Sequence, residues 1–174
     1  LCDILTKKLE LKRESELADA IEYRLGQVYQ TKLESVEQAI EYYRSILERR
    51  PEHEDANTAL RGLLENEDYR LDASRVLESV YERTEQHEKH AEILEIQLAE
   101  ESDPYAQVEL LKHIADLHQN KLGNYDSAFH DYARIVILDQ DSSYLEQIEN
   151  LIEILNNTAA LVEVYKEVVG NVYD

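Results

Sequence analysis

The stretch "LGQVYQTKL" (residues 25–33) returns in altered form as "IADLHQNKL" (residues 114–122), 89 positions later. The agreement extends beyond these residues, because residues 4–46 and 93–135 align without a gap. The alignment contains nine identities: Ile4/Ile93, Leu5/Leu94, Leu9/Leu98, Gln30/Gln119, Lys32/Lys121, Leu33/Leu122, Ala39/Ala128, Tyr43/Tyr132 and Ile46/Ile135. An internal repeat of this kind outranks other sequence signals for the fold, since a repeated sequence specifies a repeated structural unit.

A shorter spacing lies inside the 89-residue repeat. Small or apolar residues recur 13 positions apart in three pairs: Gly26/Ala39, Leu60/Ala73 and Ala115/Ala128. The first two pairs are 34 residues apart, so two 34-residue units and one further helix of about 21 residues account for the long repeat. We expect Gly26 and Ala39 to lie where two helices approach closely.

Apolar residues recur at spacings of three and four, which is typical of amphipathic helices. Gly (4) and Pro (2) are scarce, and no segment has the alternation of a strand. The sequence therefore predicts an all-α fold of about ten helices. Their expected ranges are 1–14, 16–32, 35–50, 53–66, 69–84, 87–101, 104–121, 125–139, 142–156 and 158–172.

Three local signals mark expected helix ends. "SVEQ" (residues 35–38) has the spacing of a capping box, with Ser35 as N-cap and Gln38 three positions on. "DP" (residues 103–104) places a capping Asp before a Pro at the first helical position. "GN" (residues 123–124) ends one helix and caps the next.

The residue order in these units resembles the tetratricopeptide repeat. The best match is residues 19–52, which supply Leu25, Gly26, Tyr29, Ala39, Tyr43, Ile46 and Pro51. Residues 53–86 and 108–141 match more loosely, with His118 at the position of Tyr29, and residues 142–174 match poorly. The turn is one residue longer than in that family, and the lone helix at 87–101 interrupts the pairing. Such degenerate repeats resemble those of multi-repeat proteins of bacterial type.

The resemblance implies a right-handed α-solenoid of antiparallel helix pairs over residues 1–174. Its units would be about 19–52, 53–86, 108–141 and 142–174, with the extra helix at 87–101. The chain contains no Met and both ends carry a helical pattern, so we expect a fragment of a longer protein.

In the family, ligands contact the first helix of each pair, which lines the concave surface. The resemblance therefore implies these groove residues: Tyr23, Gln27, Gln30, Asn57, Arg61, Lys112, Asp116 and Gln119. The extra helix leaves an alternative open. If it occupies the inner layer, helices 87–101 and 125–139 would form the groove wall after residue 87.

The net charge is −20 and is unevenly distributed, since residues 90–174 hold 4 basic and 17 acidic side chains. Such a surface repels nucleic-acid phosphates and anionic lipid headgroups. We expect a neutral to basic protein or peptide partner and no nucleic acid. No apolar run approaches the roughly 18 residues of a membrane span, so we expect no membrane insertion.

The sequence indicates no cofactor, metal or catalysis. Cys2 is the only cysteine, which excludes an internal disulfide. His87 and His90 could share a helix face, but no further ligands are placed to complete a zinc site. The four Gly are isolated, so no phosphate-binding loop is present. We therefore expect a protein that is not an enzyme.

Two functional interpretations remain. In the first, the concave face binds a peptide or helix of a partner, with Tyr23 as anchor and the groove amides as hydrogen-bonding groups. In the second, the chain is a structural spacer or self-association segment of a long repeat protein, joined through apolar residues of its terminal helices. Those residues are Ile4, Leu5, Leu9, Leu161, Val164 and Val168. The family resemblance favours the first interpretation.

Overall fold

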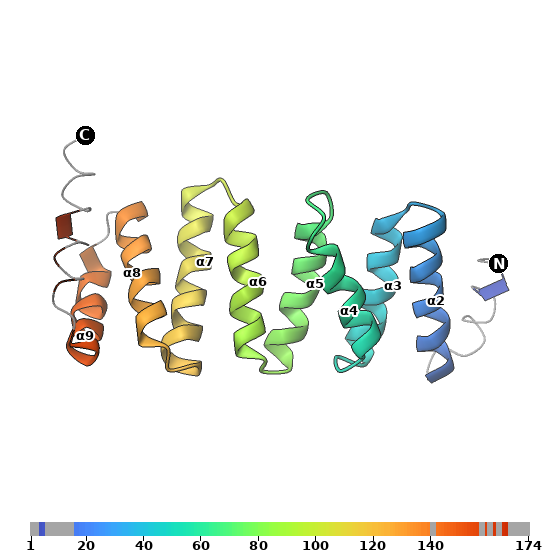
Figure 1. Cartoon of the computed structure of the whole chain (residues 1–174), viewed down its shortest axis with the longest axis horizontal. Coiled ribbons are helices and arrows are strands. Elements are labelled where there is room, and N and C mark those ends of the chain that lie inside the picture. Colours follow the sequence, from blue (N-terminus) through green and yellow to red (C-terminus); the bar gives the residue numbers. More distant parts are fainter. Residues whose placement is uncertain are drawn as a thin grey trace. The chain divides into compact units, whose positions relative to one another are not determined.

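The computed structural model describes residues 4–5, 16–139, 142–156, 159, 162 and 165–166. Within these residues the fold is helical and contains no strand, which confirms the predicted all-α class (Figure 1). The helices are α2 (Glu16–Lys32), α3 (Val36–Arg49), α4 (Glu54–Leu63), α5 (Arg70–Arg83), α6 (His87–Glu100), α7 (Pro104–Asp116), α8 (Tyr125–Asp139) and α9 (Leu145–Leu155).

The helix bounds follow the sequence pattern closely. Helices expected at 16–32 and 125–139 have those bounds as α2 and α8. The helix expected at 104–121 consists of α7 and a π-helical turn, η1 (Leu117–Lys121). The one expected at 142–156 begins with a 3-10 turn, η2 (Ser142–Tyr144), and continues as α9. The helices expected at 1–14 and 158–172 lie almost wholly outside the described residues.

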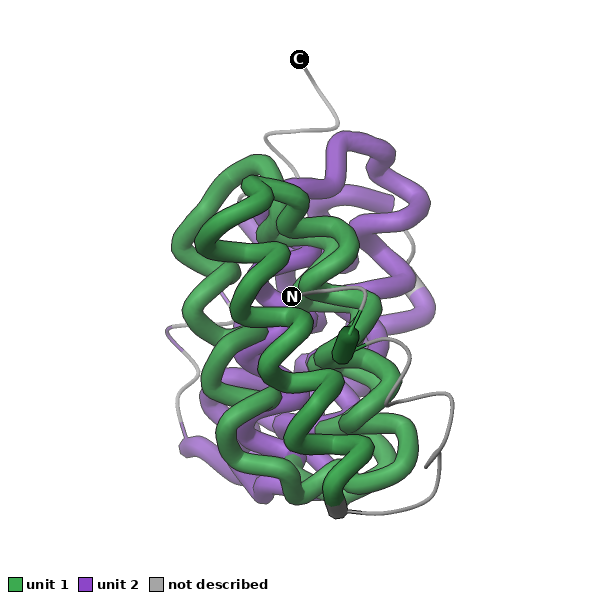
Figure 2. Tube along the Cα trace, turned by 90° about the vertical axis from the view of Figure 1, so that its right-hand side faces the viewer, with its two compact units in different colours: residues 1–86 green, residues 87–174 purple. Residues whose placement is uncertain are grey.

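The chain forms two compact units (Figure 2). Unit 1 is residues 1–86 and includes α2 to α5; unit 2 is residues 87–174 and includes α6 to α9. Within each unit, helices that follow one another in sequence pack against one another, and α3 also packs on α5. The boundary falls at the start of α6, the helix that the sequence identifies as the extra one.

Small residues permit the close approach of paired helices, as the 13-residue spacing predicts. A Cβ atom on Gly26 of α2 would lie 2.5 Å from Cε1 of Tyr43 on α3, so only glycine fits there without movement. Three alanines of the second helices have no exposed surface: Ala39, Ala73 and Ala128.

The quoted sequence ends in a wide turn that closes α2. The backbone N–H of Leu33 donates to the carbonyl oxygen of Val28 at 3.2 Å, and that of Ser35 donates to Tyr29 at 3.1 Å. The first bond spans five residues and the second spans six, compared with four in an α-helix. Between them Glu34 has φ 51°, a left-handed conformation. This wide closure accommodates the extra turn residue.

The same closure recurs in unit 2. Leu122 N–H donates to the Leu117 carbonyl oxygen at 2.9 Å, and Asn124 N–H donates to His118 at 2.7 Å. Gly123 takes the left-handed position of Glu34, with φ 64°. Each atom pair lies 89 residues after its counterpart, so the sequence repeat is also a repeat of backbone hydrogen bonds.

Two of the three capping signals are confirmed. Asp103 Oδ1 accepts from the backbone N–H of Tyr105 at 3.3 Å, with Pro104 as the first residue of α7. Asn124 Oδ1 accepts from the N–H of Ser127 at 3.2 Å and caps α8. Each cap satisfies a backbone donor that the first helical turn leaves without a partner.

The predicted capping box at residue 35 is wrong. Ser35 stands at the N-cap position of α3, but its side chain makes no capping hydrogen bond. Its hydroxyl instead donates to the carbonyl oxygen of Leu33 at 3.4 Å. The wide closure of α2 gives Ser35 a local acceptor, and this acceptor competes with the cap.

Candidate interaction surface

The predicted groove residue Gln30 accepts a hydrogen bond from a buried tyrosine. Tyr43 of α3 has no exposed surface, and its hydroxyl donates to Oε1 of half-buried Gln30 on α2 at 2.9 Å. Burial raises the pKa of Tyr43 to about 12, with a further contribution from neighbouring Tyr23. At neutral pH the hydroxyl is therefore a proton donor, and the side-chain NH₂ of Gln30 is not used in this bond.

Unit 2 repeats this bond at the equivalent residues. The Tyr132 hydroxyl donates to Oε1 of Gln119 at 2.9 Å. Both residues belong to the nine identities of the 89-residue repeat. Hydrogen bonding therefore accounts for two of the identities that apolar packing alone would not require.

A third tyrosine plays the same role between α4 and α5. Tyr81, which has no exposed surface, donates to Oδ1 of Asn57 at 2.8 Å. Its oxygen also accepts from Nη1 of Arg61 at 3.4 Å. Two further predicted groove residues are thus held by one hydroxyl from the second helix of their pair.

Tyr23 joins the helices of unit 1. Its ring centroid lies 5.8 Å from that of Tyr43 and 6.1 Å from that of His53. His53 is the N-cap of α4, and its Nδ1 accepts from the backbone N–H of Ala56 at 3.3 Å. One half-buried tyrosine on α2 therefore contacts both α3 and the start of α4.

These contacts form a continuous row across unit 1, which we call the tyrosine–amide row. One helical turn connects His53 to Asn57, whose backbone N–H donates to the His53 carbonyl oxygen at 3.1 Å. In order of contact, the row consists of Gln30, Tyr43, Tyr23, His53, Asn57, Tyr81 and Arg61.

In unit 2 different residues surround the tyrosine that is equivalent to Tyr43. The Tyr132 ring stacks on Tyr144, with centroids 5.9 Å apart and planes 24° apart. Lys112, at the position equivalent to Tyr23, has its Nζ 5.8 Å from the Tyr144 ring centroid. It also pairs with Glu109 at 2.7 Å. The contact between Lys112 and the Tyr144 ring thus takes the place of the contact between the Tyr23 and His53 rings in unit 1.

The remaining two predicted groove residues make only local contacts among those described. Gln27 Oε1 accepts from Nη1 of Arg24 at 3.1 Å. Asp116 Oδ1 accepts from Nδ2 of Asn120 at 2.7 Å. Neither bond links two helices.

Residue 118 shows a second difference between the units. In unit 1 Tyr29 stacks on Tyr42, with ring centroids 5.5 Å apart. The equivalent residues of unit 2 are His118 and Asp131, joined by a hydrogen bond of 2.7 Å between Nδ1 and Oδ2. Asp131 is only 4% exposed, and burial raises its pKa, opposed by the hydrogen bond from His118. The polar pair replaces an aromatic contact at the helix interface.

The sequence places Tyr43 and Tyr132 at equivalent positions of the repeat but does not indicate what their hydroxyl groups bind. A usable signal exists, because each lies 13 residues after its Gln and both pairs are repeated at the long period. Tyr81 and Asn57 are 24 residues apart and carry no such repeat. The role of Tyr81 depends on how α4 and α5 pack.

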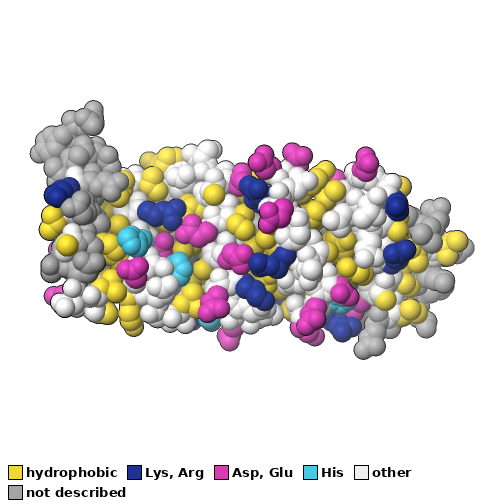
Figure 3. Space-filling view, viewed as in Figure 1, with side chains coloured by type: hydrophobic (Ala, Val, Ile, Leu, Met, Phe, Trp, Pro, Cys, Tyr) yellow, Lys and Arg dark blue, Asp and Glu magenta, His cyan; other side chains and the backbone are white. Residues whose placement is uncertain are grey.

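Basic and acidic side chains lie among one another on the face shown in Figure 3. Among the described residues, no group of three or more His, Cys, Asp or Glu side chains is arranged to hold a metal ion. No helix within the described part of the chain has the length and apolarity needed to cross a membrane.

No protein-family model matches the chain, and no curated protein sequence matches it.

Proposed function

We propose that this chain is part of a tetratricopeptide-like α-solenoid and acts as a non-catalytic protein-interaction scaffold. Its ligand is a peptide segment or helix of a partner, which binds to the tyrosine–amide row in unit 1 or to the equivalent residues in unit 2. The observation that supports this proposal is the set of tyrosine hydroxyls that fix Gln30, Asn57 and Gln119 at 2.8 to 2.9 Å.

The fixed amides suit recognition of a polypeptide backbone. Each uses its carbonyl oxygen to accept from a tyrosine, which leaves its NH₂ group as a donor for a ligand carbonyl. All three amide side chains are only half-buried, so they combine fixed geometry with access from outside. Donors that are held in place lose little conformational entropy on binding, which favours affinity.

Charge defines the class of partner. A chain with net charge −20 attracts neutral to basic segments and repels acidic ones. The proposed ligand therefore carries Lys or Arg beside the residues that bind to the row.

One observation favours a structural spacer or self-association segment as a second candidate. Every predicted groove residue already has a contact inside its own unit, from the ring contacts of Tyr23 to the bond between Asp116 and Asn120. Under this alternative the tyrosine–amide bonds only hold helix pairs together, and no ligand binds to the face.

Affinity capture with the purified chain distinguishes the binding scaffold from the structural spacer. The variant Tyr23→Ala/Gln27→Ala removes an anchor and an amide from the face, and Tyr105→Ala, an exposed tyrosine outside it, is the control. We expect a protein that wild type and control capture, that the double variant loses, and that high salt weakens. Recovery of the same proteins by all three, or of none, would reject the binding role and favour the spacer.

A further inference from the structure

The two units differ at the open end of the repeated helix pair, opposite the turn. In unit 1 this end holds an ion cluster in which the carboxylates are buried and the arginines are partly exposed. Arg49 Nη2 lies 2.9 Å from Oδ1 of Asp19 and also pairs with Glu22, while Arg50 Nη1 lies 3.1 Å from the other oxygen of Asp19. Asp19 and Glu22 are 4% and 7% exposed. Charged side chains fill the space between α2 and α3.

In unit 2 three of the four equivalent residues are apolar, and the fourth, at the position of Arg50, is Asp139. Val108, Leu111 and Leu138 stand 89 positions after Asp19, Glu22 and Arg49. A pocket of about 310 Å³ lies at this end of α7 and α8. The residues that line it are Leu98, Gln107, Leu111, Arg134, Ile137 and Leu138.

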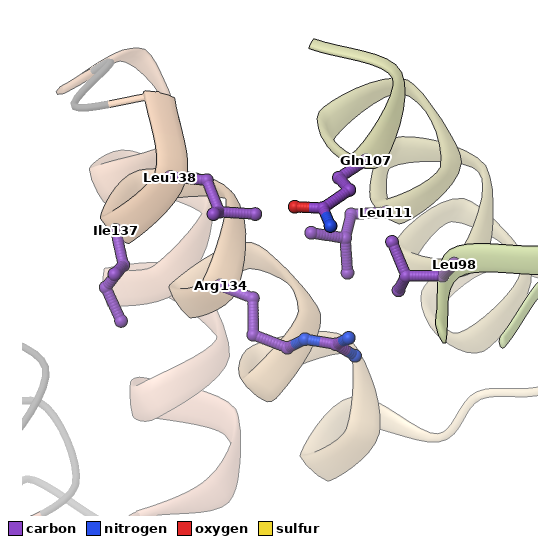
Figure 4. Close-up of a pocket in the computed structure, with 6 residues that line it drawn as sticks. All are labelled: Leu98, Gln107, Leu111, Arg134, Ile137 and Leu138. Atoms are coloured by element: carbon purple, nitrogen blue, oxygen red, sulfur yellow. The ribbon is translucent and has the colours of Figure 1, made fainter. Parts of the chain in front are cut away.

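Four of the six lining residues are apolar. Figure 4 shows Leu98, Leu111 and Gln107 on one side of the pocket, facing Leu138 and Arg134 of α8 on the other. Leu98 and Leu111 are buried, whereas Leu138 at the mouth is 41% exposed. The pocket therefore offers apolar surface that an incoming group can cover.

Both polar lining residues already have partners. Gln107 Nε2 donates to the carbonyl oxygen of Glu101 at 2.6 Å. Arg134 Nη1 holds the carboxylate of Glu95 at 3.1 Å. Neither needs a polar ligand, so the pocket fits an apolar group better than an anion.

Size and charge restrict the occupant. Pockets for cofactors and drug-sized ligands span roughly 300 to 1,000 Å³, so this one is at the lower limit and suits one or two apolar side chains. Around it, Glu95, Glu101, Asp131 and Asp139 outnumber Arg134. A second copy of this chain also has a net charge of −20, so repulsion disfavours it as the occupant of the pocket.

We propose that this pocket of unit 2 binds a leucine- or isoleucine-sized side chain of a partner protein, carried on a segment with Lys or Arg beside it. The apolar anchor occupies the place where unit 1 has its ion cluster of Asp19, Glu22 and the two arginines. This site shares no residue with the tyrosine–amide row or its unit 2 equivalents, so it can be tested apart from the function proposed above.

Peptide selection tests the proposal without a known partner. A random peptide library displayed on phage is selected against the whole chain, and the enriched peptides are synthesised with a fluorescent label for affinity measurements. Leu138→Asp is the test variant, since Leu138 lies at the mouth and its replacement spares the buried lining. Ile154→Asp is the matched control, because Ile154 of α9 is 58% exposed, is apolar and lies outside the pocket.

We expect enriched peptides in which Leu or Ile adjoins Lys or Arg. Leu138→Asp should weaken their binding at least about tenfold, as for loss of one apolar anchor, although it adds a negative charge. Ile154→Asp and Tyr23→Ala/Gln27→Ala should leave affinity within about twofold, as substitutions outside an anchor pocket usually do.

Three outcomes would overturn the proposal. One is the failure to enrich peptides with an apolar residue beside a basic one. Another is equal binding of the peptides by wild type and Leu138→Asp, which would reject the pocket as their site. If Tyr23→Ala/Gln27→Ala then loses this binding, the proposed function gains support. The third is self-association in sedimentation that Leu138→Asp abolishes, which would make a second copy the occupant.

Discussion

Tyr43 donates a hydrogen bond of 2.9 Å to Gln30, and 89 residues later Tyr132 donates a hydrogen bond of the same length to Gln119. In each case the second helix of a pair supplies the hydroxyl and the first supplies the amide. The repeated bond fixes the register of the helix pair, and it also orients a half-buried amide. One contact thereby serves both the fold and the proposed binding face.

Double-mutant cycles should detect this bond in both units. We expect Tyr43→Phe with Gln30→Ala to give a coupling energy of about 1 kcal/mol in urea unfolding, the usual net value of such a hydrogen bond. Tyr132→Phe with Gln119→Ala should give a similar value. A cycle that pairs Tyr43→Phe with Gln119→Ala is the control, and a coupling as large there would show that the bond is not the cause.

Gly26→Ala should destabilise unit 1. The added Cβ would lie 2.5 Å from the Tyr43 ring, which is buried and cannot move freely. Such overpacking costs about 1 to 3 kcal/mol. Gly62→Ala in α4 is the matched control, since a Cβ there meets nothing within 4 Å and should stabilise the helix by up to about 1 kcal/mol. Thermal melts that rank the two variants in the opposite order would contradict the packing of α2 on α3.

The left-handed residue of the wide turn predicts opposite effects in the two units. Glu34 has φ 51° and is exposed, so Glu34→Gly should raise the free energy of unfolding by about 1 kcal/mol. Gly123→Ala should lower it by about the same amount, because Gly123 has φ 64°. Glu34→Ala separates loss of charge from the backbone effect, and a gain from Ala equal to that from Gly would exclude the backbone explanation.

Asp131 should give unit 2 a specific pH dependence. Burial raises its pKa above the usual 3.8, so its contribution to stability is full below that pH and is lost as pH rises through the folded-state pKa. Asp131→Asn keeps an oxygen for His118 but does not titrate. We expect the stability of Asp131→Asn relative to wild type to increase from about pH 4 upward in urea unfolding. A constant or falling difference would mean that the bond from His118 outweighs burial.

Local sequence rules were sufficient to predict where the helices lie. Caps such as Asp103 and Asn124, and the spacing of apolar residues, act within a few positions and can be read directly from the chain. The exception is Ser35, where the wide turn supplied a competing acceptor that the capping pattern does not encode. A local motif is unreliable where a neighbouring structure offers its side chain another bond.

The candidate surface was only partly predictable. The resemblance selected Gln30 and Asn57, but the tyrosines that hold them come from the next helix, at a register that depends on helix packing. The unit 2 pocket was not foreseen at all, because it results from the volumes left after Leu138 and Leu111 replace an ion cluster. Such spaces depend on three-dimensional packing and have no signature in sequence spacing.

The most direct measurement of the central claim is an NMR titration of the ¹⁵N-labelled chain with the partner segment recovered by affinity capture. The side-chain NH₂ signals of Gln30, Asn57 and Gln119 report on the groups proposed to bind. We predict that they shift on addition of the segment and that Tyr43→Phe reduces the change at Gln30. Unchanged side-chain signals at all three residues, with the segment bound elsewhere, would contradict the account.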